Sequence, residues 1–186
     1  MLHAIMRSML QFYRKIILLL VVLFPLSAHA DPLNEALIYH TYFSGPEEVK
    51  RLLDKGANPN ATDPHSWPAL AIAADRNDKD ATRIAALLIS AGADVNAAKD
   101  RNYPIINAIR NDNAALVALL MENGANIRVH DSKGNSTLAL AKEMENESIV
   151  YFLQKKAFEE RQLQTYLGSR LRLRQLVEKF SWDNCQ

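Results

Sequence analysis

The sequence of 186 residues contains a single cysteine, Cys185, which stands next to the C-terminal residue. One cysteine cannot form an intramolecular disulfide, so the fold must be stabilised by packing and not by covalent links. Two interpretations of this thiol stay open. It is either an inert group in the tail, which the sequence favours, or a group that forms a mixed or intermolecular disulfide.

The chain has little excess of charge and no long hydrophobic run. It contains 22 Lys and Arg against 21 Asp and Glu. Because binding to nucleic acid needs a basic surface, we expect no nucleic-acid partner. The apolar run from residue 16 to residue 26 spans about 11 residues, whereas a membrane-spanning helix needs roughly 20.

This short apolar run lies in a typical export signal. Arg7, Arg14 and Lys15 precede it, and Ser27-Ala-His-Ala30 follows it. A basic segment, an apolar core and an Ala-x-Ala site together predict a secretory signal peptide that is cleaved after Ala30. An uncleaved membrane anchor is the alternative, which the length of the run disfavours. Removal of 30 residues leaves 156 residues with 19 basic and 21 acidic side chains, a net charge of −2.

Motifs for catalysis and metal binding are also lacking. The mature chain has three histidines, His40, His65 and His130, and none belongs to a His-Glu-x-x-His motif. The sequence contains no glycine-rich phosphate loop and no Gly-x-Ser-x-Gly motif. We therefore predict a protein that is not an enzyme, without catalytic residues, metal ligands or a cofactor.

What the sequence does contain is a short motif that occurs three times, which we call the Gly-Ala phrase. Gly-Ala followed by Asn or Asp begins at Gly56, Gly92 and Gly124, so the starts are 36 and 32 residues apart. Each copy follows an apolar, helix-like run. A period of roughly 33 residues is typical of stacked helical repeats, in which neighbours bury the apolar faces that one repeat cannot bury alone. Glycine directly after a helix predicts a helix end in the left-handed conformation.

The residues around these phrases resemble a known repeat. The third unit reads Asp-Ser-Lys-Gly-Asn-Ser-Thr-Leu-Ala-Leu-Ala at 131–141, and the second reads Tyr-Pro-Ile-Ile-Asn-Ala at 103–108. Over about residues 33–154 the chain resembles ankyrin repeats, which implies an all-α solenoid. The family's Thr-Pro-Leu-His turn is degraded, since Ala71, Ile106 and Ala139 occupy the usual histidine position. We therefore expect these repeats to be less stable than idealised ones.

The sequence patterns and the resemblance together predict three regions. They are a signal peptide (1–30), an ankyrin-repeat domain (31–154) and a basic amphipathic helical tail (155–186). Within the ankyrin domain we expect an N-terminal capping repeat at 33–55 and full repeats at 56–91, 92–123 and 124–154.

In the capping repeat, Ser44 and Glu47 predict a capping box, and Pro46 suits the first turn of a helix. We expect the aromatic cluster at Tyr39, Tyr42 and Phe43 to pack against the next repeat, with a role in binding as the alternative.

Two features distinguish the first full repeat and the tail. The connection at 76–80 is about three residues longer than the family norm, and we interpret it as a surface loop in which Asp80 caps the next helix. In the tail, seven Lys and Arg against four Asp and Glu give a charge of +3, which leaves −5 on the array. We expect Gly168 to break the tail into two helices that cover the open end of the stack. Contact with anionic lipid or an acidic partner is the alternative.

The resemblance implies that the protein binds another protein on a concave surface made by turn tips and inner helices. The polar and aromatic residues at these positions are His65, Trp67, Arg76, Asn77, Arg101, Asn102, Tyr103, Arg110, Asn111, His130, Lys133 and Asn135. Because Trp, Tyr and Arg are frequent interface hot spots, Trp67, Arg101, Tyr103 and Arg110 are the strongest candidates. For Trp67 and Tyr103 the alternative is a packing role beside the neighbouring proline.

The chain is also similar to small bacterial exported ankyrin proteins, which implies location in the periplasm, or secretion otherwise. Two roles remain open. One is a scaffold or protective factor for an envelope protein, and the other is an immunity or inhibitor protein that blocks a toxin or lipase acting in the periplasm. We expect a monomer.

Overall fold

The computed structural model describes the backbone of residues 31–183 and the side chains up to residue 172 and at residue 174. The predicted signal peptide, its cleavage site at Ala30, and Cys185 lie outside these described residues. The residues from Leu33 onward form one compact unit that contains all of the hydrophobic core found among the described residues.

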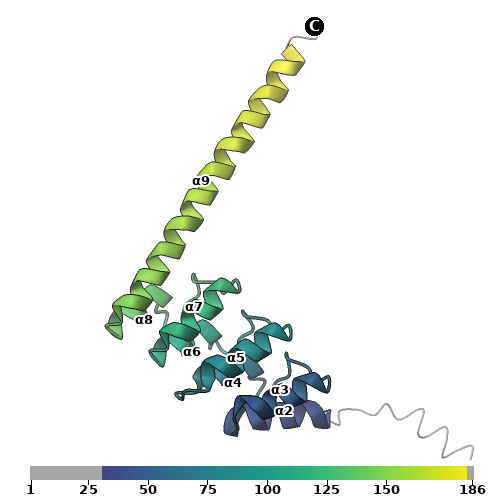
Figure 1. Cartoon of the computed structure of the whole chain (residues 1–186). Helices are drawn as coiled ribbons and strands as arrows, with labels where there is room; N and C mark the ends of the chain where they lie inside the picture. Colours follow the sequence, from purple (N-terminus) through teal and green to yellow (C-terminus); the bar gives the residue numbers. More distant parts are fainter. Residues whose placement is uncertain (1–30, 184–186) are drawn as a thin grey trace, which may run out of the picture. The chain divides into compact units, whose positions relative to one another are not determined.

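The described residues fold into four consecutive helix pairs, shown in Figure 1. The pairs are α2 (Pro32–Phe43) with α3 (Pro46–Asp54), α4 (Ala69–Asp75) with α5 (Ala81–Ser90), α6 (Pro104–Arg110) with α7 (Ala114–Glu122), and α8 (Thr137–Glu143) with α9 (Glu147–Asp183). The inner helices α4, α6 and α8 pack in chain order, and so do the outer helices α3, α5, α7 and α9. Isolated β-bridges close the turns before the inner helices, at Thr62–Pro68, Lys99–Asn102 and His130–Ser136. The predicted all-α solenoid is therefore confirmed.

The three glycines of the repeated phrase end the outer helices as predicted. Gly56, Gly92 and Gly124 have φ angles of 94°, 97° and 86°. A Cβ atom built at any of them would meet nothing within 4 Å. The requirement for glycine therefore comes from the left-handed backbone alone, and a β-branched residue should cost about 1 kcal/mol or more.

Small residues in α4 allow the inner helices to approach closely. The whole stretch from Ala69 to Ala74 is buried. Ile106 of the next inner helix is fully buried beside it in the core. Asn107 is also buried, and its amide nitrogen donates to the carbonyl oxygen of Ala71 at 3.2 Å. One polar bond inside the core thus fixes α6 on α4, because an unpaired amide there would be costly.

Asparagines join each Gly-Ala phrase to the repeat before it. The side chain of Asn60 donates to the carbonyl oxygen of Gly92 at 3.1 Å and accepts the N–H of Asp94 at 2.7 Å. Asn96 makes the same two bonds to the following phrase, with Gly124 and Asn126. These bonds form a ladder along the stack.

The ladder stops in the third phrase. Arg128 stands where the first two phrases have Asn60 and Asn96. Its guanidinium forms an ion pair with Glu160 of α9 at 3.2 Å. The residue that would hold a further repeat therefore holds the terminal helix instead.

Helix α9 is longer than predicted, because it runs through Gly168 without a break. The prediction of two helices was wrong. A glycine in a helix interior costs only about 1 kcal/mol relative to alanine, which the many flanking helical residues outweigh. The outer helix of the third repeat and the tail are therefore one element, and the division proposed at residue 154 falls inside it. No helix among the described residues is both long enough and apolar enough to cross a membrane.

Among the described side chains, the contacts of helix α9 with the array lie in its N-terminal part, up to Glu160. Ile149 and Leu153 are buried, and Phe152 and Ala157 pack against the core. Tyr166, further along, is 61% exposed. The first part of α9 thus closes the stack, and the part after Glu160 extends beyond it. The prediction that the apolar stripe of the tail covers the open end was wrong for the described residues, because Leu163, Leu167 and Leu171 are exposed.

Two predicted helix caps differ from those observed. The N-cap residue of α3 is Gly45, and the hydroxyl of Ser44 instead lies 2.7 Å from His40 Nδ1, so the capping box was wrong. Asp80 is the N-cap residue of α5, as predicted, but its side chain makes no capping bond. Asp78 Oδ1 accepts the N–H groups of Asp80 and Ala81 instead.

Candidate functional site

A buried aspartate organises the turn before α4. Asp63 Oδ1 accepts the N–H groups of His65 at 2.9 Å and Trp67 at 2.8 Å, and Oδ2 accepts the hydroxyl of Tyr42 at 3.0 Å. Burial alone would raise the pKa of Asp63, but these three bonds hold it below its ordinary value. Burial and the same hydroxyl bond raise the pKa of Tyr42 to about 12. The turn is therefore fixed through its backbone, and the His65 side chain is left exposed.

The turn before α8 has the same construction around Asp131. Its Oδ1 accepts the N–H groups of Lys133 at 2.9 Å and Asn135 at 2.8 Å, and Arg110 pairs with Oδ2 at 3.0 Å. Burial would raise the pKa of Asp131, but the bonds from Asn135, Arg110 and Lys133 hold it below its ordinary value. Lys133 and the neighbouring His130 remain exposed.

Neither aspartate was among the predicted site residues. The sequence does carry a signal for them, because Asp63 and Asp131 each stand five residues before the N-cap residue of an inner helix, Pro68 and Ser136. Their role is to shape the turns that carry exposed side chains.

The middle turn is shorter and strained. Asp100 and Arg101 have φ angles of 50° and 62°, and the N–H of Asn102 donates to the carbonyl oxygen of Lys99 at 2.8 Å. Two central residues with positive φ form a type I′ turn, in which glycine or asparagine is usual. Arg101 takes this conformation with an exposed side chain.

The two aromatic candidates are not equivalent. Tyr103 is the N-cap residue of α6, whereas Trp67 stands one residue before the N-cap residue of α4. Both side chains are half-buried and pack against the hydrophobic core. The structure therefore gives each a packing role and leaves part of each ring exposed to a partner.

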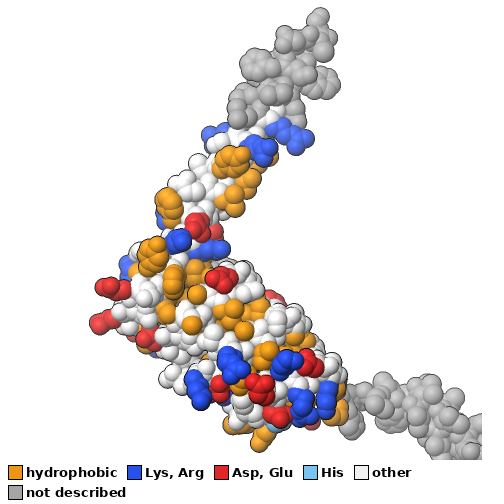
Figure 2. Space-filling view, in the orientation of Figure 1, with side chains coloured by type: hydrophobic (Ala, Val, Ile, Leu, Met, Phe, Trp, Pro, Cys, Tyr) orange, Lys and Arg blue, Asp and Glu red, His pale blue; other side chains and the backbone are white. Residues whose placement is uncertain are grey.

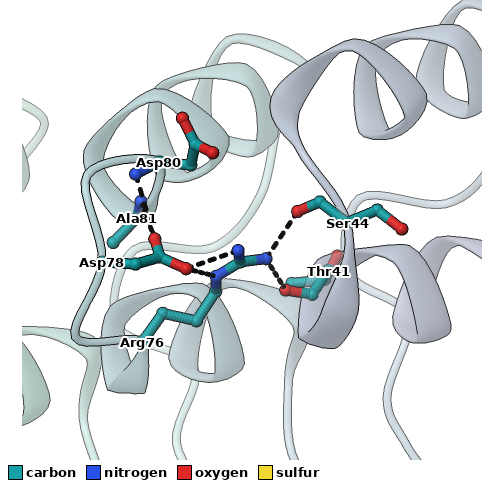
Figure 3. Close-up of polar contacts among 6 residues, drawn as sticks. All are labelled: Thr41, Ser44, Arg76, Asp78, Asp80 and Ala81. Carbon is teal, nitrogen blue, oxygen red and sulfur yellow. Dashed lines mark hydrogen bonds and ion pairs between the residues drawn. The ribbon is translucent and has the colours of Figure 1, made fainter.

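Arg76 ties the first two helix pairs together (Figure 3). Its guanidinium donates to the carbonyl oxygens of Thr41 at 2.7 Å and Ser44 at 2.8 Å, and also to Asp78 Oδ2. Its side chain is only 13% exposed. Burial would raise the pKa of Asp78, but the bond from Arg76 and two backbone N–H groups hold it below its ordinary value. The longer loop at 76–80 is thus a structural joint between repeats.

Other candidates are also used within the fold. The amide nitrogen of Asn111 donates to the carbonyl oxygens of Ala74 and Asp75 at the end of α4. Asn102 accepts a bond from Arg110, and Asn135 donates to Asp131.

Five candidates remain with exposed side chains, and they are His65, Asn77, Arg101, His130 and Lys133. His65 and His130 lie in turns that are separated by the turn at 99–102. Among the described residues, no group of three or more His, Cys, Asp or Glu could hold a metal ion.

The aromatic cluster of α2 lies on the surface and not in the core. Tyr39 is 60% exposed and Phe43 is 72% exposed, with their ring centroids 5.2 Å apart. The expectation that the cluster packs against the next repeat was therefore wrong, apart from the hydroxyl bond of Tyr42 to Asp63. The ring of Phe43 also contacts that of Tyr42, whose hydroxyl reaches Asp63 of the first turn, so the cluster adds exposed apolar area that is linked to this turn.

Residues 80–162 match the family model of ankyrin repeats, which contains three copies of the repeat. No curated protein matches the chain. The match covers α5 to the first part of α9, and the same helix pairs and turns continue on its N-terminal side. The fold is an all-α ankyrin-repeat solenoid, and ankyrin repeats are protein–protein interaction modules, typically without enzymatic activity.

Proposed function

We propose that this protein is a non-catalytic binding module that holds another protein against the turn tips and inner helices of its array. In this proposal it acts in the cell envelope as a scaffold or protective factor. The observation that carries the proposal is that some residues of the turns fix the backbone while others keep exposed side chains. Asp63 and Asp131 fix the backbone, while His65, Lys133 and Arg101 keep exposed side chains on successive turns. A rigid frame of this kind presents side chains with little ordering cost on binding.

Arg101 supports the proposal most directly. Its left-handed conformation costs about 1 kcal/mol or more for a residue with a Cβ atom, and such strain tends to persist at functional sites. Glycine would relieve this strain in a type I′ turn. An exposed arginine at a position that suits glycine better favours a role for its guanidinium in binding.

Affinity capture tests the proposal. Residues 31–186 are immobilised and incubated with envelope extract, alongside the variants Arg101→Gly and Lys133→Ala. Because Arg101→Gly relieves strain, a loss of binding cannot be assigned to unfolding. The matched control is Lys50→Ala, which removes an exposed charge from the outer helix α3.

We expect the two turn variants to lose at least about tenfold in affinity, which corresponds to about 1.4 kcal/mol, while the control binds normally. Equal binding by all four proteins would contradict the proposal. The identity of the captured protein separates the two roles, since a toxin or lipase would indicate an inhibitor and an endogenous envelope protein a scaffold.

Location in the envelope rests on the basic, apolar and small-residue pattern of residues 1–30. Mass spectrometry of the protein from its native cell tests it. An N-terminus at Asp31 in an envelope fraction is the expected result, and an uncleaved chain in the cytosol would contradict it.

A further inference from the structure

The part of α9 that extends beyond the array presents an apolar stripe. We call residues 161–174 the projecting segment. Leu163, Tyr166, Leu167 and Leu171 are 58%, 61%, 48% and 61% exposed. Their spacing of three or four residues places them on one face of the helix. Nothing in the described array covers this face, although the same helix buries Ile149 and Leu153 two to four turns earlier.

All charged residues of the projecting segment are basic. They are Arg161, Arg170, Arg172 and Arg174, and the sequence has no Asp or Glu between Glu160 and Glu178. The array at residues 31–154 has the opposite sign, because 12 Lys and Arg against 17 Asp and Glu give a charge of −5. The positive charge of the chain is thus concentrated where the helix leaves the array.

Apolar and basic side chains share one face of this segment. Leu167, Arg170, Leu171 and Arg174 line a single shallow hollow on the helix surface. Figure 2 shows apolar and basic side chains together along this part of α9. Arg161 and Arg172 stand about half a helical turn away from this face at 100° per residue. A surface that offers acyl chains and anionic headgroups together would match this mixture.

We propose that the projecting segment lies flat on an anionic phospholipid surface. Leucine and tyrosine side chains enter the boundary between headgroups and acyl chains. Arg170 and Arg174 lay their apolar stems along the stripe and extend their guanidinium groups to lipid phosphates. The acidic array is repelled by the same surface, so its turn tips stay available to a protein partner.

A second copy of the chain is the competing occupant of the stripe. In a parallel pair of these helices, each Arg170 and each Arg174 would approach the same residue of the other copy across the seam. Like charges at such positions oppose the pairing. Anionic lipid instead provides counter-charges along the whole segment.

Vesicle sedimentation with residues 31–186 tests the proposal, since these residues include the compact unit. One set of vesicles contains phosphatidylcholine with about 30% phosphatidylglycerol, and the other contains phosphatidylcholine alone. With about 1 kcal/mol from each arginine near such a surface, the double variant Arg170→Gln/Arg174→Gln should weaken binding about 25-fold. The matched control Arg161→Gln/Arg172→Gln removes the same charge from the opposite face and should weaken binding less than about fivefold.

A second pair of substitutions, Leu163→Ser/Leu167→Ser, should weaken binding more than about tenfold at unchanged net charge. Far-UV circular dichroism checks that α9 remains helical in each variant. Equal binding to both kinds of vesicle, or equal losses in the two arginine variants, would overturn the proposal. Absence of lipid binding with dimers that dissociate on Leu163→Ser/Leu167→Ser, seen by analytical ultracentrifugation, would assign the stripe to a second copy.

Discussion

The two ends of the stack are closed in different ways. At the N-terminal end, Arg76 is almost buried and reaches two carbonyl oxygens of the first helix pair. At the C-terminal end, the corresponding tie is the ion pair of Arg128, 58% exposed, with Glu160. A shielded guanidinium with several acceptors stabilises far more than a pair in solvent. We infer that the first joint is rigid and that α9 is held mainly by the apolar contacts of its first turns.

The largest effect is expected at the N-terminal joint. Arg76→Ala leaves the carbonyl oxygens of Thr41 and Ser44 without their donor and should lower the free energy of unfolding by about 2–3 kcal/mol. Urea denaturation followed by circular dichroism measures this. A change below about 0.5 kcal/mol would show that this joint is no tighter than the other end.

Acid and alkali should loosen the same end. The carboxyl of Asp63 has a lowered pKa, so its contribution to stability is present above pH 4 and is lost as the pH falls below the ordinary aspartate pKa of about 3.9. The pKa of Tyr42 is raised to about 12, so its contribution is lost as the pH rises from about 10 to 12.

Unfolding curves between pH 2 and 12 test both limits. In Tyr42→Phe the alkaline loss should shrink, whereas Tyr166→Phe on α9 is the control and should leave it unchanged. If Tyr42→Phe lost as much stability at alkaline pH as the wild type, the hydroxyl of Tyr42 would not be the cause of that loss.

A smaller and local effect is expected at Gly168. Gly168→Ala should stabilise the projecting segment by up to about 1 kcal/mol, since the site is helical and has room for a Cβ atom. Hydrogen exchange should slow at residues 161–174 while the urea midpoint of the array stays constant. A shift of that midpoint would show that the segment is coupled to the stack more tightly than we infer.

The smallest effect is expected at the C-terminal tie. Arg128→Ala should lower the free energy of unfolding by less than about 1 kcal/mol, because its ion pair with Glu160 is solvent-exposed. The same urea experiment measures it. A loss as large as that of Arg76→Ala would remove the difference between the two ends.

The sequence predicted those features that depend on neighbours along the chain. The Gly-Ala phrases gave the repeat and its left-handed helix ends, because both follow from local backbone conformation. Arg76 and Asn111 were assigned to the binding surface, although their partners lie 32 to 37 residues away on another repeat. Such contacts depend on how the repeats stack, which local patterns do not specify.

The sequence also predicted only part of the candidate binding surface. The turn positions of His65, Arg101 and Lys133 followed from the repeat. The exposure of Tyr39 and Phe43 did not, because aromatic residues at a helix end suggest burial when the neighbouring surface is unknown. Gly168 was misjudged because a weak local preference was given more weight than the length of the helix.

The position of Arg128 also bears on how such an array grows. Each repeat binds the next one through an asparagine that stands four residues after its glycine, as at Asn60 and Asn96. Duplication of residues 92–123 would place a donor and an acceptor at each new junction, so the stack could lengthen from within. Addition after residue 128 would meet a guanidinium instead of an amide. One side chain in each repeat thus determines whether a further repeat can be added, and Arg128 is the residue that ends the array.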